Sequence, residues 1–325
     1  MKFKRILSTV LVTGMALTLL AGCGQQQGAT QSGGTAQSNK TYTIGVSLDT
    51  SKDFTATVIK GVNAYAKEHP NVKVTILDAN SDPATQLKHV ENLISQGVDA
   101  VVMKPCDVTT TQPITQALSD AKIPLIVVNS SLPTNQTFAT YVGSDNVKAG
   151  ELEMQPIADK LNGKGNIAIL MGEPGNQATS DRIKGNMNVI AKYPGLKVVS
   201  QQNGSWVRDK AMTIVENWLQ SGMKIDAIVA NNDEMAIGAA LALKESNNTK
   251  ILGAGIDATS DGLKMLKSGQ LAVTVFQNGY QQGFEAMDAT VKILQGQKLP
   301  KYEDIPFEQI TPDKADQLIA TLNKE

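Results

Sequence analysis

A cluster of polar residues, 231–234, lies between two apolar segments of different periodicity. The run before it, Ile225–Val229, has the length of a buried strand, and a helical apolar pattern begins at Met235. In open parallel sheets, small ligands bind where strands end and helices begin. Asn232 can both donate and accept hydrogen bonds there, while Asp233 can cap the following helix. Capping and turn chemistry alone would also explain these residue types.

Polar or aromatic residues follow most of the other predicted strands as well. In a doubly wound fold, such side chains would point toward one crevice. The complete set is Asp53, Phe54, Asn129, Arg182, Trp206, Asn232, Asp257 and Gln277. Taken one at a time, these residues have simpler explanations. Trp206 and Phe54 could pack in the core, Arg182 could lie on the surface of a helix, and Asp257 could cap a helix. The prediction of a binding site rests on their shared topological position.

The chemistry of this set suits a small neutral polyhydroxy ligand. Amide side chains both donate and accept, as hydroxyl groups require. Asp257 can accept from two hydroxyls, and Arg182 offers a planar fork to a third. Trp206 and Phe54 provide flat apolar faces for the C–H face of a sugar ring.

The elements that would position these side chains alternate along the chain from residue 41 onward. Short runs rich in Val and Ile lack a clean polar alternation, which is typical of parallel strands covered on both faces. Repeated strand–helix units predict the α/β class, with doubly wound, Rossmann-like parallel sheets. The predicted strands are Thr43–Leu48, Val72–Asp78, Ala100–Lys104, Leu125–Asn129, Thr140–Gly143, Asn166–Met171, Lys197–Ser200, Ala227–Ala230, Ile251–Gly255 and Ala272–Gln277.

The pattern repeats as two halves that divide near residues 143–146. A helix is expected over Gly279–Leu294, followed by a turn-rich crossing over residues 295–304. The second half is thus inserted, and the chain returns late to the first lobe. Several crossings between lobes make a hinge that can close on a ligand in the cleft. The expected lobes are residues 41–143 plus 278–304 and residues 144–277 plus 305–325.

The first forty residues have the composition of an export signal and a tether. A basic start precedes an apolar run that is too short for a transmembrane helix and fits a secretory signal. The run ends in Leu20-Ala21-Gly22-Cys23, which resembles the lipobox of bacterial lipoproteins. We therefore expect a signal peptide over residues 1–22, and a lipidated Cys23 that begins a flexible tether over residues 23–40. An ordinary signal peptide that happens to carry a Cys is the alternative.

Composition argues against several other classes of protein. The chain has 30 basic and 31 acidic residues, so it lacks the basic excess of a nucleic-acid-binding protein. Cys106 would be the one free Cys, which excludes a disulfide framework and is better explained by packing at a strand end than by nucleophilic catalysis. His69 and His89 have no metal-ligand spacing, and we expect both on the surface. We expect no catalytic residue, no metal and no cofactor.

Four segments carry a resemblance to a known family. They are residues 230–238, 255–262, 143–146 and 180–185. With them, residues 41 to about 311 resemble the ribose-binding family of type I periplasmic binding proteins, which serve ABC importers. The resemblance implies two lobes joined by three crossings, near Ser144, residues 277–278 and residues 304–305. It also implies ligand contact by Phe54, Asn129, Arg182, Trp206, Asn232, Asp257 and Gln277.

The sequence departs from that family at two positions. Many members have a second aromatic residue where this chain has Thr55, and pentose and hexose binders often carry Asp-Arg where it has Asn129-Ser130. The second change removes a charge-assisted clamp and predicts a more neutral, roomier pocket on that side. This argues against ribose and favours a hexose or a cyclic polyol such as an inositol.

The function expected from the sequence is therefore capture of a monosaccharide or cyclic polyol and its delivery to the transmembrane subunits of an ABC permease. We expect a monomer, lipid-anchored on the outer face of the cell membrane or on the periplasmic side. The alternative is a lipoprotein that presents the same site to a membrane receptor. An enzyme acting on sugars would need paired acids; Asp53 and Asp257 are the one candidate pair.

Overall fold

The computed structural model describes residues 40–49 and 53–324. The predicted signal peptide and Cys23 lie outside these ranges, as does the predicted tether up to residue 39. Residues 40–325 form one compact unit. Within the described part of the chain, no helix has both the length and the apolar composition needed to cross a membrane.

The first of two six-stranded sheets has the strand order β11-β5-β4-β3-β1-β2. Every neighbouring pair in it is parallel. Its strands are β1 (Tyr42–Leu48), β2 (Val72–Asp78), β3 (Ala100–Met103), β4 (Leu125–Val128), β5 (Thr140–Gly143) and β11 (Tyr302–Asp304).

The second sheet has the order β12-β10-β9-β8-β6-β7, which repeats the order of the first sheet strand for strand. Its edge strand β12, which the sequence did not predict, pairs antiparallel with β10, while the other neighbouring strands pair parallel as expected. The strands are β6 (Lys164–Met171), β7 (Gly195–Asn203), β8 (Ala227–Ala230), β9 (Leu252–Asp257), β10 (Val273–Phe276) and β12 (Glu308–Ile310).

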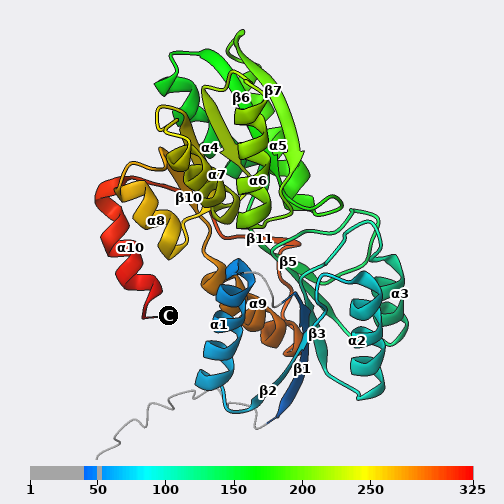
Figure 1. The fold of residues 1–325 in the computed structure, drawn as a ribbon. Coiled ribbons are helices and arrows are strands. Elements are labelled where there is room, and N and C mark those ends of the chain that lie inside the picture. Colours follow the sequence, from blue (N-terminus) through cyan, green and yellow to red (C-terminus); the bar gives the residue numbers. More distant parts are fainter. Residues whose placement is uncertain (1–39, 50–52, 325) are drawn as a thin grey trace, which may run out of the picture. The chain divides into compact units, whose positions relative to one another are not determined.

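Helices cover both faces of each sheet (Figure 1). In the first lobe, built on the first sheet, α1 and α9 pack on one face and α2 and α3 on the other. In the second lobe, α4 and α5 cover one face, and α6 and α7 the other. These helices are α1 (Asp53–Glu68), α2 (Pro83–Ser95), α3 (Gln112–Asp120), α4 (Asn146–Lys160), α5 (Gln177–Ile190), α6 (Arg208–Gln220), α7 (Asp233–Glu245) and α9 (Gly279–Leu294).

The inner strands β3, β4 and β8 are buried along their whole length, which explains their unbroken apolar sequence. The predicted α/β class with two doubly wound lobes is confirmed. Three elements complete the second lobe: α8 (Ser260–Lys267), the short 3-10 helix Pro312–Lys314 and α10 (Ala315–Leu322).

The chain passes between the two sheets three times: after β5, after β10 and between β11 and β12. Hydrogen bonds join the first and third passages. The Ile305 N–H donates to the Gly143 carbonyl at 2.7 Å, and the Ser144 hydroxyl donates to the Ile305 carbonyl. The Gln282 amide in α9 donates to Ser144 Oγ at 2.8 Å. The sequence did not predict β11 or β12, because three residues are too few to show a periodic pattern.

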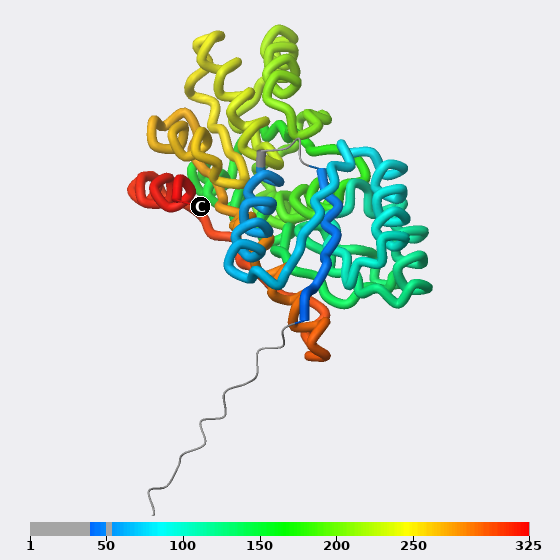
Figure 2. The backbone as a smooth tube through the Cα atoms, turned by 90° about the horizontal axis from the view of Figure 1, so that it is seen from below, coloured from blue at the N-terminus to red at the C-terminus, as the bar shows by residue number. Residues whose placement is uncertain are grey.

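Glycines let two pairs of helices approach through their backbones. A Cβ on Gly150 of α4 would lie 2.0 Å from the Arg182 carbonyl oxygen in α5, and one on Gly185 would lie 2.1 Å from the Val147 carbonyl oxygen. Gly61 in α1 meets the backbone of α9 in the same way, and both views show α1 and α9 side by side (Figures 1 and 2). Any side chain here would force the helices apart.

We predict that Gly150→Ala destabilises the protein by about 1–3 kcal/mol, because the added methyl group meets backbone that cannot move aside alone. Urea unfolding measures the change. Lys148→Ala, at an exposed position of the same helix, is the control and should have little effect. Equal stability of Gly150→Ala and the wild type would contradict the close packing of α4 on α5.

Candidate ligand-binding site

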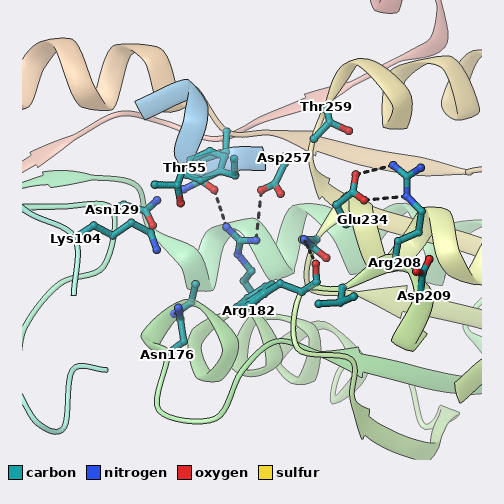
Figure 3. Close-up of a pocket in the computed structure, with 16 residues that line it drawn as sticks. Thr55, Lys104, Asn129, Asn176, Arg182, Arg208, Asp209, Glu234, Asp257 and Thr259 are labelled. Atoms are coloured by element: carbon teal, nitrogen blue, oxygen red, sulfur yellow. Dashed lines mark hydrogen bonds and ion pairs between the residues drawn. The ribbon is translucent and has the colours of Figure 1, made fainter. Parts of the chain in front are cut away.

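A cavity of about 300 Å³ lies at the carboxyl ends of strands from both sheets (Figure 3). The structure brings together seven of the eight side chains predicted from the sequence, and places them in its lining: Phe54, Asn129, Arg182, Trp206, Asn232, Asp257 and Gln277. Asp53 begins α1, and its side chain is outside the described part of the structure.

Arg182 is the centre of the hydrogen-bond network in this cavity. The residue is 3% exposed, and its Nη1 lies 3.6 Å from Oδ1 of Asp257. Nη2 donates to Gln277 Oε1 at 2.7 Å, and Nη1 donates to the Asn231 carbonyl. Nε donates to Asn146 Oδ1 at 3.0 Å. These partners fix the plane of the fork before any ligand arrives, which lowers the entropic cost of binding.

Asn146 was not predicted as a site residue, and it does not line the cavity. It is the first residue of α4, directly after the first passage between the sheets, and it is buried. Its position next to Arg182 depends on the close packing of α4 on α5 at Gly150. The glycine contact between these helices therefore positions the guanidinium.

The two predicted aromatic residues lie against glycines. The Trp206 ring covers Gly172, where a Cβ would be 2.0 Å from Cζ2, and the Phe54 ring would be 3.1 Å from a Cβ on Gly279. Arg182 Cζ is 5.8 Å from the centroid of the Trp206 ring, which is within the range of a cation–π contact. Both aromatic faces are thus held in place by neighbouring backbone.

The amide side chains differ in what they can still offer a ligand. Gln277 Nε2 is buried and has no hydrogen-bond partner among the described residues, so its N–H groups remain for a ligand. The Asn129 amide already donates to Gln282 Oε1 at 3.0 Å. Asn232 Oδ1 accepts from the Met235 N–H at 3.1 Å, so Asn232 is itself the cap of α7.

The prediction that Asp233 caps this helix is wrong. Asp233 is fully buried and accepts from the Thr259 N–H at 2.8 Å and from the Thr274 hydroxyl at 2.7 Å. Its carboxylate therefore stabilises the turn that follows β9, the strand that ends at Asp257. Asn232 is the residue that directly precedes the helix. Its side chain, and not that of Asp233, therefore lies nearest to the free N–H groups of the first turn.

Three of the cavity residues have backbone conformations that L-amino acids rarely adopt. The φ angles are +68° at Asn129, +65° at Trp206 and +119° at Asp257. Such conformations cost about 1–3 kcal/mol each and persist where the surrounding structure imposes them, often at functional sites. Here they turn three side chains toward one cavity.

Residues 44–298 match the family described as periplasmic binding protein domain. The chain belongs to the periplasmic binding protein family. It is 39% identical over 277 residues to the xylitol-binding protein of Mycolicibacterium smegmatis, covering 84% of this chain and 77% of that protein. It is 34% identical over 305 residues to the ribose import binding protein of Bacillus subtilis, and the match covers 94% of this chain and 98% of that protein.

The chain is also similar to a solved structure from Bacillus halodurans. That structure is an ABC transporter solute binding protein with bound myo-inositol, and the similarity covers nearly all of it. The identity is 37%, the TM-score is 0.84, and the match covers 87% of this chain and 99% of that chain. The expectation of a binding protein rather than an enzyme agrees with this family.

Several cavity residues of this periplasmic binding protein were missed from the sequence. They are Thr55, Lys104, Asn176, Ala178, Val207, Arg208, Asp209, Glu234 and Thr259. Lys104 could have been found, because it is the last residue of a predicted strand and obeys the same strand-end rule as Asn129. Its position beside Asn129 corrects the expectation of a more neutral pocket on that side (Figure 3).

An ion pair borders the cavity on the side of the second lobe. Arg208 Nε and Nη2 each lie 2.9 Å from one oxygen of the Glu234 carboxylate, and Nη2 lies 3.6 Å from Asp261. Such a bidentate pair is planar and directional. The Glu234 charge is therefore already balanced, which leaves Asp257 as the principal acceptor for ligand hydroxyls.

Burial raises the pKa of Asp257 above its ordinary value, and the Arg182 guanidinium opposes that rise. Hydroxyl groups that donate to a carboxylate stabilise its ionised form. A polyhydroxy ligand would therefore lower the pKa of Asp257 again, and this carboxylate suits a neutral hydroxyl donor better than an anion.

The other candidate reactive groups are not arranged for chemistry. The Cys106 thiol is half-buried, and burial raises its pKa to about 11, so the reactive thiolate is scarce at neutral pH. Both histidines are half-buried rather than on the surface as expected, and the His69 ring stacks on Tyr65 with centroids 3.9 Å apart. Among the described residues, no group of three or more His, Cys, Asp or Glu could hold a metal ion.

A buried carboxylate behind the site was also missed. Glu153 of α4 is fully buried and accepts from the Asn186 amide at 3.0 Å. Burial raises its pKa to about 8. The folded chain thus holds this proton more tightly than the unfolded chain, so its stabilising contribution is complete below about pH 4.5 and is lost as the pH rises through about 8.

We predict that Glu153→Gln raises the midpoint of thermal unfolding by roughly 3 °C or more at about pH 9, with a smaller effect at about pH 5. The amide cannot ionise, so it avoids the cost of a buried charge. Thermal unfolding across this pH range measures the difference. Glu245→Gln, at an exposed position, is the control. A shift for Glu153→Gln that is the same at both pH values would contradict a buried, titrating carboxyl.

Proposed function

We propose that this protein binds a monosaccharide or cyclic polyol outside the cytoplasm and delivers it to an ABC importer. The observation that carries the proposal is the buried group of Arg182, Asp257 and Gln277. It presents a fixed cationic fork, a carboxylate acceptor and an unpartnered amide donor to one cavity. Each buried polar group left unmet costs binding free energy, so ligands lacking matching hydroxyls are rejected.

The hydroxyl-rich class of ligand follows from charge and shape. Asp257 is paired with Arg182, and Glu234 with Arg208, so a neutral ligand leaves these ion pairs intact. Trp206 and Phe54 supply apolar faces for ring C–H groups. The relatives that are named for xylitol and ribose, and the one with bound myo-inositol, support this class.

A ligand with six carbon atoms fits the space better than the smallest members of this class. A second cavity of about 310 Å³ adjoins the first and shares Phe54, Asp257 and Gln277 with it. The combined space favours a hexose or an inositol over ribose.

We propose that the lobes are residues 41–143 plus 278–304 and residues 144–277 plus 305–325, and that the three passages between them form a hinge. Closure would bury the ligand, and the closed form would be the one recognised by the permease. A ligand favours closure only by its differential affinity for the closed form. The eight sequence-predicted residues, Asp53 included, are proposed as ligand contacts within this scheme.

We also propose that Cys23 carries a lipid and that residues 23–40 tether the binding unit to the membrane. An anchor with more than one acyl chain holds a protein stably at a membrane surface. The support is the sequence Leu20-Ala21-Gly22-Cys23 at the end of an apolar run.

We predict that at least one pentose, hexose, inositol or linear polyol stabilises residues 40–325 against heat. Amino acids, tested in the same panel, should not. A ligand at about a hundred times its dissociation constant should add about 2.7 kcal/mol to the free energy of unfolding. Arg182→Ala and Asp257→Ala should each weaken binding about 100-fold or more, because each leaves a buried charge unpaired. Calorimetry measures both affinities.

Lys184→Ala, at an exposed position of the same helix as Arg182, should bind as the wild type does. Wild-type affinity in the Arg182 or Asp257 variant would contradict the site. A response to amino acids alone would contradict the proposed class of ligand.

We predict that Cys23→Ser moves the full-length protein from the membrane fraction to the soluble extracytoplasmic fraction, because serine cannot accept the lipid. Cell fractionation followed by immunoblotting measures the distribution. Cys106→Ser, which changes the other Cys, should leave it unchanged. The same distribution for wild type and Cys23→Ser would rule out the lipid anchor.

A further inference from the structure

The two lobes touch at a place other than the passages between the sheets. The segment after β6 in the second lobe meets the segments that follow β3 and β4 in the first. Gln177 Oε1 accepts from the Ser131 N–H at 2.6 Å, and the Gly175 carbonyl accepts from the Val108 N–H at 3.4 Å. We call these two hydrogen bonds the cross-lobe contact.

Gln177 is held in the orientation that this contact needs. Its Nε2 donates to Asp181 Oδ2 at 2.8 Å, one turn further along α5. Since a carboxylate accepts hydrogen bonds and cannot donate them, the amide nitrogen must face Asp181. The amide oxygen is therefore directed at the Ser131 N–H, and the side chain is pre-ordered for the other lobe.

Gly175 shows how closely the segments approach. Its φ is +79°, and a Cβ there would lie 2.9 Å from the carboxylate of Asp107 in the first lobe. A side chain would be strained by the backbone conformation and would also press on Asp107. The two lobes can reach this separation because residue 175 has no side chain.

The residues of the cross-lobe contact stand outside the cavity. Neither cavity is lined by Val108, Ser131, Gly175 or Gln177, although their neighbours Asn129 and Asn176 line the first one. A change at Gln177 or Gly175 therefore removes none of the side chains that line the two cavities. Such a change instead alters the free energy of this arrangement of the lobes, with both lining the cavity, relative to other arrangements.

We propose that Gln177 and Gly175 set the affinity of this protein by stabilising the ligand-competent arrangement of its lobes before ligand binds. They are positioning residues that act through the cross-lobe contact. The apparent dissociation constant equals the intrinsic one divided by the fraction of molecules in the competent arrangement. A smaller competent fraction therefore raises the apparent dissociation constant in proportion. The part of this inference that concerns affinity rests on the proposed function.

The test compares Gln177→Met with Gln116→Met in residues 40–325. Gln116 of α3 makes the same type of pair, with Asp120 at 2.8 Å, but it is exposed and this pair lies within its own helix. Methionine keeps the length of the side chain and removes the acceptor. We expect Gln177→Met to raise the dissociation constant of the ligand found in the sugar and polyol panel roughly fivefold, the value of one net hydrogen bond. Gln116→Met should not change it.

A second measurement needs no ligand. Spin labels at Lys88 in α2 and Asn217 in α6, both exposed, report the distance between the lobes in a Cys106→Ala background. We expect Gln177→Met and Gly175→Ala to shift this distance distribution of the ligand-free protein toward longer values, and Gln116→Met to leave it unchanged. Unchanged distances in both variants would overturn the inference, even if the panel gave no ligand. Longer distances with no ligand found would support the inference while contradicting the proposed function.

Discussion

A buried guanidinium is the constraint on which the rest of this structure depends. Removing an arginine from water is costly unless every donor is met, and a broken partnership leaves an uncompensated charge. Arg182 meets this demand with partners from four places in the sequence: the start of α4, the turn after β8, the end of β9 and the residue after β10. The glycine contact between α4 and α5 brings the first of these close enough. The second lobe is thus organised so that one charge can be buried in a fixed orientation.

The same organisation decides what remains for a ligand. Several hydrogen-bonding atoms of the cavity are already used within the protein, as with Asn232 Oδ1 at the helix cap and the Asn129 amide on Gln282. The amide of Gln277 is the clearest exception, because it is buried and unpartnered. A few unmet groups in fixed positions discriminate more sharply than many adaptable ones, since each mismatch leaves a buried atom without a partner. Selectivity therefore comes from the small number of free positions.

The sequence allowed the fold and seven of the sixteen cavity-lining residues to be predicted, because both follow from local rules. Strands buried on both faces are continuous apolar runs, and the residue after each such run points to the ligand edge. The same rule should have included Lys104. Other features follow from tertiary contacts that no local pattern carries. Asp233 looked like a cap, but its carboxylate bonds to Thr259 and Thr274 from distant segments. Glu153 is buried only through the packing of α4, which its local sequence does not show.

The matching strand orders of the two sheets have a consequence for the order in which the chain can fold. Residues 42–143 supply five of the six strands of the first sheet, but the face that carries α1 is covered by α9, residues 279–294. During synthesis from the N-terminus, the first lobe therefore keeps an apolar face exposed until the whole second sheet except its edge strand has emerged. The first lobe is therefore not an independent early folding unit, because completion of its core waits for α9, which begins in about the last seventh of the chain.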